Sequence, residues 1–187
     1  MLNFVSSPHV NGIDLAAVRE TVEAIQEDPG LAKARFDVTT RWAGQTRSES
    51  FVDGFTLGGK RYERQHRILA DEPCELLGTD SAPNPQELLM AAFNACIMVG
   101  YVANASLKGI RLDSVEIRTR GTLDLRGFLG LDDQVAPGYE AIDYDVYIKG
   151  DGTSADFLEI HQAVMKTSPN YFNMSRPIRM NGTIHVG

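Results

Sequence analysis

Two cysteines are the residues of this sequence best suited to covalent chemistry. Cys74 and Cys96 are the only cysteines among 187 residues, and the four histidines, at positions 9, 66, 161 and 185, are scattered along the chain. A thiolate is a strong nucleophile, so a suitably placed cysteine can attack an electrophile such as a peroxide. Two cysteines do not make a disulfide framework, and no paired Cys or His stands at the spacing of a zinc site. We therefore expect no metal and no bound cofactor.

Cys96 lies in the middle of a segment that is predicted to be a long buried helix. Asn84 is a favoured N-cap residue, Pro85 suits the first helical position, and Glu87 completes a capping box. The helix should end near Lys108-Gly109. At about 100° per residue, the face of Cys96 also carries apolar or small side chains, namely Leu89, Ala92, Phe93, Val99, Gly100 and Ala103. Cys96 is then either a reactive thiol or a small core residue, and composition leaves both open.

The same helix raises the question of a membrane span, because Leu88 to Leu107 is a run of 20 residues without a charge. Asn94, Asn104 and Ser106 interrupt the run, small residues dominate it, and neither a second span nor a basic flank accompanies it. We interpret it as the central helix of a folded domain and expect no membrane partner.

Short periodic segments surround this helix. Residues 12–28 show helical spacing that Pro29-Gly30 ends, residues 34–70 alternate as two or three antiparallel strands, and residues 71–83 make a loop. After the long helix, residues 112–150 indicate a hairpin with a long loop, residues 154–167 a helix capped by Ser154, and residues 176–186 a closing strand. This order is typical of an α+β fold. We expect a helical N-terminal extension over residues 1–33 and one domain over 34–187.

Charge and composition exclude several classes of partner. Eighteen Lys and Arg against 25 Asp and Glu give a net charge of −7, which repels nucleic-acid phosphates. The one basic run, Lys60 to Arg67, would be divided between the two faces of a strand. We expect no nucleic-acid partner. The N-terminal residues show no secretory-signal pattern, so the expected location is the cytoplasm.

Five segments carry a resemblance to a known family. The stretch APNPQELLMAAFNACIMVGY, preceded by RILADEP and LLGTD and followed by TSPNYFNM and PIRMNGTIHV, resembles the signatures of the OsmC/Ohr thiol peroxidases over residues 34–187. The resemblance implies an OsmC-like α+β fold in which antiparallel sheets pack around a long buried central helix. It also implies an intertwined homodimer and a redox enzyme of the stress response that reduces organic hydroperoxides.

The resemblance also implies roles for individual residues. Cys96 takes the position of the attacking cysteine, and Ser168 stands where the family has its second cysteine. Gln86 replaces the family's Glu after the helix-start Pro. Arg67 matches the family's Arg, with Arg64 and Arg41 as weaker alternatives; a guanidinium there lowers the thiolate pKa and stabilises the leaving alkoxide. Glu87, nine residues before Cys96, would face the opposite side of the helix, and Cys74 lies outside the position of the second cysteine.

Two hypotheses for function follow. The first is an oxidoreductase in which Cys96 attacks an organic hydroperoxide and an external thiol, rather than a second cysteine, resolves the oxidised product. The second is a non-catalytic protein of the same fold that binds an apolar small molecule, with a pocket lined by Phe93, Met98, Tyr171, Phe172 and Met174. A purely structural or regulatory interaction protein has no sequence feature in its favour.

Overall fold

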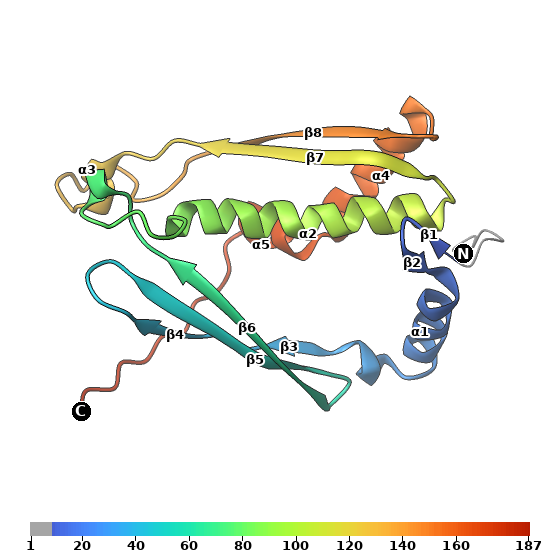
Figure 1. Cartoon of the computed structure of the whole chain (residues 1–187), viewed down its shortest axis with the longest axis horizontal. Helices are drawn as coiled ribbons and strands as arrows, with labels where there is room; N and C mark the ends of the chain where they lie inside the picture. The colour runs from blue at the N-terminus through green and yellow to red at the C-terminus, as the bar shows by residue number, and fades with distance from the viewer. Residues whose placement is uncertain (1–8) are drawn as a thin grey trace. The chain divides into compact units, whose positions relative to one another are not determined.

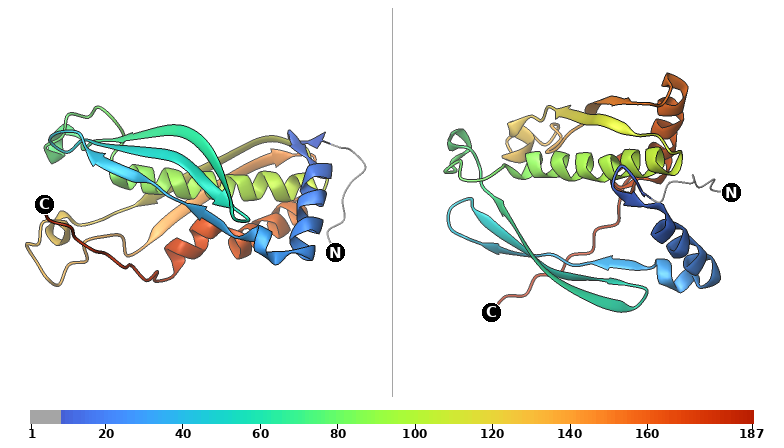
Figure 2. Two further views of the ribbon diagram at one scale, coloured as in Figure 1. Left: turned by 90° about the horizontal axis from the view of Figure 1, so that it is seen from below. Right: turned by 45° about the vertical axis from the view of Figure 1, so that its right-hand side comes forward.

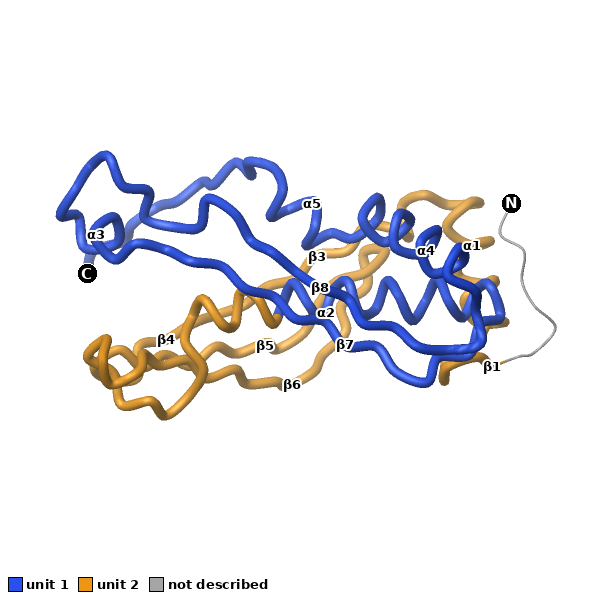
Figure 3. Tube along the Cα trace, turned by 90° about the horizontal axis from the view of Figure 1, so that it is seen from above, with its two compact units in different colours: residues 1–5, 92–187 blue, residues 6–91 orange. Residues whose placement is uncertain are grey.

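The computed structural model describes residues 9–187, which form two compact units. Within the described residues, unit 2 comprises 9–91 and unit 1 comprises 92–187 (Figure 3). One long helix, α2 (Pro85–Leu107), begins in unit 2 and continues into unit 1. Residues 1–8 lie outside the described residues. The expectations about a signal segment and about the start of the N-terminal extension partly rest on them.

Unit 2 opens with the predicted N-terminal helix. A hairpin of β1 (His9–Val10) and β2 (Ile13–Asp14) precedes α1 (Leu15–Glu27) and the short helix η1 (Pro29–Ala32). Asp14 caps α1, since its Oδ1 accepts from the backbone N–H groups of Ala16 and Ala17. The helix predicted over residues 12–28 is therefore confirmed.

The rest of unit 2 is an antiparallel sheet. Its strands are β3 (Ala34–Phe36), β4 (Thr39–Trp42), β5 (Ser48–Leu57) and β6 (Lys60–Ala70), and β5 pairs with the other three. Phe36, Phe55 and Tyr62 stack in a row across the sheet, with the Arg64 guanidinium over the ring of Phe55. A loop with the short helix η2 (Cys74–Leu76) then leads to α2. The strands predicted in residues 34–70 are present.

Unit 1 is built on α2. An antiparallel hairpin of β7 (Leu112–Gly121) and β8 (Ile142–Gly150) runs along the helix, and α4 (Ser154–Thr167) and α5 (Pro169–Ser175) follow β8 (Figure 1 and Figure 2). The loop of the hairpin contains the short helix α3 (Leu125–Phe128). The core consists of α2, α4 and inward residues of the hairpin: Phe93, Ile97, Tyr101, Ala105, Ile110, Ile160 and Val164, with half-buried Val115, Ile117, Tyr144, Val146 and Ile148 around them.

The predicted start of α2 is confirmed in detail. Oδ1 of Asn84 accepts from the backbone N–H of Gln86, and the Glu87 carboxylate accepts from the backbone N–H of Asn84, as a capping box requires. Among the described residues, α2 is the one helix long and apolar enough to cross a membrane, a test that core helices of soluble proteins also pass. Its face with Phe93, Ile97 and Tyr101 is buried in the core of unit 1.

Three predictions about local structure are wrong. The segment predicted as a closing strand, residues 176–186, forms no strand. An alternating segment becomes a strand only beside another strand edge, and no strand pairs with it in the described chain. Its apolar side chains, Ile178, Met180, Ile184 and Val186, are therefore between 52% and 86% exposed. The helix α4 is capped by Thr153 rather than Ser154, since Thr153 and Asp156 make the capping box. The helix α2 is not buried all round, because Val99 is 69% exposed.

Candidate active site

The thiol of Cys96 lies against the hydroxyl of Ser168 in unit 1. Sγ of Cys96 is 3.4 Å from Oγ of Ser168, although the two residues are 72 positions apart in the chain. Ser168 is 7% exposed, whereas Cys96 is half-buried. The structure therefore brings together two of the four predicted site residues.

The packing of α2 against α4 holds this pair. Along the two helices, Cys96 lies by Ser168, Gly100 by Val164 and Lys108 by Glu159, so the helices run antiparallel. A Cβ atom on Gly100 would stand 3.0 Å from Cγ1 of Val164. Glycine therefore permits the close approach that brings the end of α4 to Cys96.

The hydrogen bonds of Ser168 leave its hydroxyl proton available to the sulfur. Ser168 caps α5, and its Oγ accepts from the backbone N–H of Tyr171 at 3.3 Å. Its backbone N–H donates to the carbonyl oxygen of Val164 at 2.8 Å. With one lone pair of Oγ engaged, the hydroxyl is free to donate toward Cys96, an interaction that strengthens when the sulfur is a thiolate.

A cavity of about 290 Å³ in unit 1 is lined by neighbours of this pair, although neither Cys96 nor Ser168 lines it. Its lining includes Phe93, one turn before Cys96 on α2, and Tyr171, which is bonded to Ser168; the other lining residues are Tyr139, Glu140, Ala141, Ile142, Tyr144, Met174 and Ser175. Three residues of the predicted pocket, Phe93, Tyr171 and Met174, line it. Phe172 is instead exposed with the Arg176 guanidinium over its ring, and Met98 is half-buried away from the lining.

The other two predicted site residues, Arg67 and Gln86, belong to unit 2. The guanidinium of Arg67, on β6, forms an ion pair with the carboxylate of Glu49 on β5. Gln86 is exposed in the first turn of α2 and donates its backbone N–H to Asn84. Within unit 2, the alternative cations are engaged with aromatic rings, Arg64 with Phe55 and Arg41 with Phe51.

Cys74 also belongs to unit 2 and is exposed at the start of η2. Its loop is organised by a buried carboxylate that the sequence did not single out. Asp71 accepts hydrogen bonds from the hydroxyls of Thr46, Thr79 and Ser81 and from the backbone N–H groups of Glu72, Thr79 and Ser81. These bonds, those from Thr79 first, hold the pKa of Asp71 well below its usual range. The loop before α2 is therefore fixed around one ionised side chain.

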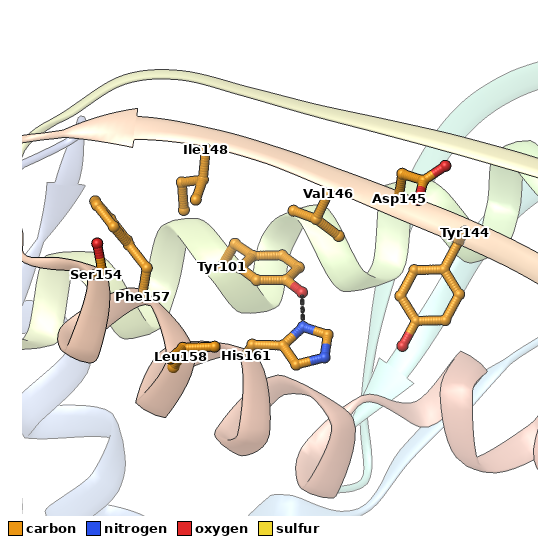
Figure 4. Close-up of a pocket in the computed structure, with 9 residues that line it drawn as sticks. All are labelled: Tyr101, Tyr144, Asp145, Val146, Ile148, Ser154, Phe157, Leu158 and His161. Atoms are coloured by element: carbon orange, nitrogen blue, oxygen red, sulfur yellow. Dashed lines mark hydrogen bonds between the residues drawn. The ribbon is translucent and has the colours of Figure 1, made fainter.

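A hydrogen-bonded Tyr–His pair is the second feature that the sequence did not predict. The hydroxyl of Tyr101, on α2, is 2.5 Å from Nδ1 of His161, on α4 (Figure 4). Tyr101 is 1% exposed, and burial raises its pKa. His161 had been one of four scattered histidines, and no local pattern in the sequence links it to Tyr101, which is 60 positions away.

Comparisons with known proteins agree on one family. Residues 78–181, more than half of the chain, match the family model described as OsmC-like protein; this range includes Gln86, Cys96 and Ser168 and excludes Arg67. No curated protein matches the sequence.

Solved structures show the same fold at low identity. An OsmC-like protein from Mycoplasma pneumoniae superposes with a TM-score of 0.59 at 15% identity, covering 75% of this chain and 87% of its own. An OsmC-like protein of unknown function from Vibrio cholerae gives 0.54 at 13% identity, covering 74% and 92%. With its α+β fold of antiparallel sheets and a long central helix, the chain belongs to the OsmC-like protein family.

Proposed function

We propose that this protein is a single-cysteine, thiol-dependent peroxidase that reduces organic hydroperoxides at Cys96. The observation that carries the proposal is the contact of 3.4 Å between Sγ of Cys96 and Oγ of Ser168. A hydroxyl here can stabilise a thiolate, but it cannot form a disulfide with it. The oxidised cysteine must then be resolved by a thiol from outside the chain.

The reaction takes place in three steps. The Cys96 thiolate attacks one peroxide oxygen, the O–O bond breaks, and the alkoxide leaves as an alcohol after protonation, so that the sulfur becomes a sulfenic acid. A first external thiol attacks this sulfur, which releases water and forms a mixed disulfide. A second external thiol attacks the mixed disulfide, returns Cys96 to the thiolate and leaves as the external disulfide. The sum converts one hydroperoxide and two thiols into one alcohol, one water and one disulfide.

Two unit 2 residues have supporting roles in this proposal. We propose that the guanidinium of Arg67 is the cation that stabilises the departing alkoxide. Within unit 2 its guanidinium forms an ion pair with the carboxylate of Glu49. Gln86 can orient a guanidinium by a hydrogen bond but adds no charge, so the first step should be slower than with a carboxylate at this position.

The cavity beside Cys96 supports an apolar substituent on the hydroperoxide. Aromatic and thioether side chains, among them Phe93, Tyr171 and Met174, line about 290 Å³. The same observation favours the second candidate function, a protein that binds an apolar small molecule there without reacting with it. The two candidates differ in whether Cys96 is consumed and regenerated.

Steady-state turnover separates these candidates. Consumption of cumene hydroperoxide would be followed with and without dithiothreitol for wild type, Cys96→Ser and Cys74→Ser. The peroxidase proposal predicts thiol-dependent turnover by wild type and Cys74→Ser and none by Cys96→Ser. Binding of cumyl alcohol by all three proteins without any turnover would support the non-catalytic function instead.

We also propose that the protein is a homodimer. Several apolar side chains are exposed in both units, including Phe36 on the unit 2 sheet, Val99 on α2 and the alternating Ile178, Met180, Ile184 and Val186. Exposed apolar surface on this scale favours association with a second copy. Sedimentation velocity at micromolar concentration should show a dimer, and Ile184→Asp with Val186→Asp should shift it toward monomer. A wild-type monomer would refute the assignment.

The proposed setting of the reaction is the cytoplasm, where external thiols are abundant. The net charge of −7 supports the absence of a nucleic-acid partner, and we propose no membrane partner. Cell fractionation with an antibody to the chain tests this location.

A further inference from the structure

A second concave surface of unit 1 lies between β8 and α4, with Tyr101 of α2 at its floor (Figure 4). It encloses about 570 Å³ and is not lined by Cys96 or Ser168. Val146, Ile148, Phe157 and Leu158 provide apolar walls; Tyr144, Asp145, Ser154 and His161 complete the lining. This groove has no role in the proposed peroxidase reaction.

The Tyr101–His161 hydrogen bond fixes which nitrogen of His161 can serve a ligand. Because burial raises the pKa of Tyr101, its hydroxyl keeps the proton and donates to Nδ1. In the neutral ring the proton then belongs on Nε2, which is a donor. Figure 4 shows Nε2 on the side of the ring away from Tyr101, and within residues 9–187 no acceptor bonds to it.

The charged groups around the groove already have partners. Asp145 of β8 accepts from Nη1 of Arg120 at 2.5 Å, and on α4 Glu159 accepts from Nζ of Lys108 at 2.7 Å while Asp156 serves the capping box. The rings of Tyr101 and Tyr144 flank His161, with centroids at 6.1 and 6.5 Å. Asp145, the one carboxylate of the described residues that lines the groove, is thus already paired with Arg120.

We propose that this groove binds a small monocarboxylate with an aromatic or branched apolar body. The carboxylate accepts a hydrogen bond from Nε2 of His161, and the body packs on Val146, Ile148, Phe157 and Leu158. The volume lies within the usual range for small-molecule sites, and apolar walls with a few polar groups, here His161, Ser154 and Asp145, are their usual composition. The carboxylate accepts from the Nε2–H of the neutral ring, so the hydrogen bond from Tyr101 to Nδ1 is kept when the ligand binds.

The probe is 4-phenylbutyrate, and 4-phenylbutanol is its uncharged control. Calorimetric titration of wild type should show saturable binding to the acid that is about tenfold or more tighter than to the alcohol, the difference expected of a charge-assisted hydrogen bond. His161→Leu removes the donor, and it should reduce the affinity for the acid to that for the alcohol. Proton NMR should show that the acid, and not the alcohol, shifts the ring-proton resonances of His161 in wild type.

The remaining variants separate this site from Cys96. Cys96→Ser should bind the acid as wild type does, so that loss of peroxidase activity and loss of binding are distinguishable. Leu158→Ser should weaken binding of the acid and of the alcohol alike, because it removes an apolar wall of the groove and leaves the His161 hydrogen-bond donor in place. The proposal is overturned if wild type binds neither compound, if it binds both equally, or if His161→Leu binds the acid unchanged.

Discussion

Replacing Ser168 by cysteine should turn Cys96 into one half of an intramolecular disulfide. The side-chain atoms of the wild-type pair are 3.4 Å apart, and a disulfide needs about 2.0 Å between its sulfurs. The longer C–S bond of cysteine and a small χ1 rotation of each residue can close this difference. Ser168 follows the last residue of α4, where the chain turns into α5, so the adjustment need not distort a helix.

The size of the closed loop sets the expected stabilisation. A cross-link between residues 72 apart removes about 15 cal/mol/K from the unfolded chain, which is about 4.4 kcal/mol at 25 °C. Strain in the folded state lowers this value. We therefore expect oxidised Ser168→Cys to unfold with a free energy about 3 to 4 kcal/mol higher than its reduced form.

The assay is intact mass and urea unfolding in a Cys74→Ser background. One equivalent of hydroperoxide should remove two hydrogens from Ser168→Cys without adding oxygen, and the urea midpoint should rise until a reductant is added. The matched control, Ser168→Cys with Cys96→Ser, should show neither change. A Ser168→Cys variant that keeps both thiols, or that only gains oxygen, would refute the placement of position 168 beside Cys96.

Three further variants test other parts of the structure. Gly100→Ala should lower the free energy of unfolding by about 1 kcal/mol. The new methyl would stand 3.0 Å from Val164, and this overpacking outweighs the gain in helix propensity. A double-mutant cycle with Val164→Ala, measured by urea unfolding, should show that the two changes are coupled. Asp71→Asn should cost about 3 kcal/mol by leaving buried donors without an acceptor. The pKa of Asp71 is lower in the folded state than in the unfolded state. The stability that the ionised carboxylate contributes is therefore complete above the unfolded pKa of about 4 and is lost as pH falls toward the folded value. Below about pH 4, wild type should accordingly lose stability more steeply than Asp71→Asn. Asn84→Ala should cost about 1 kcal/mol in thermal unfolding by removing the cap of α2, whereas exposed Gln86→Ala should change stability by less than about 0.5 kcal/mol.

Local sequence signals predicted the elements that local forces determine. The Asn84-Pro85 start and Glu87 fixed the beginning of α2, and the bonds they make in the structure are those of a capping box. Alternation in residues 112–125 and 139–150 predicted the hairpin that packs on α2, whose strands are 112–121 and 142–150. These signals involve neighbours within a few residues, so a single sequence contains them.

The features that the sequence did not predict depend on distant partners. Residues 176–186 alternate as a strand does, but alternation cannot specify which edge will pair with them. The contact of Tyr101 with His161 joins positions 60 apart, and Asp71 collects donors from three places in the chain. The position of Ser168 near Cys96 came from resemblance to a family rather than from any pattern within the chain, and the structure supplies its geometry.

Direct detection of the oxidised cysteine tests the central claim most closely. The Cys74→Ser protein would be treated with one equivalent of cumene hydroperoxide, trapped with dimedone and digested for peptide mass analysis. A dimedone adduct on Cys96 that dithiothreitol prevents, together with release of one equivalent of cumyl alcohol, is the predicted result. An unmodified Cys96 with the hydroperoxide left intact, at concentrations that fill the cavity beside it, would contradict the peroxidase account.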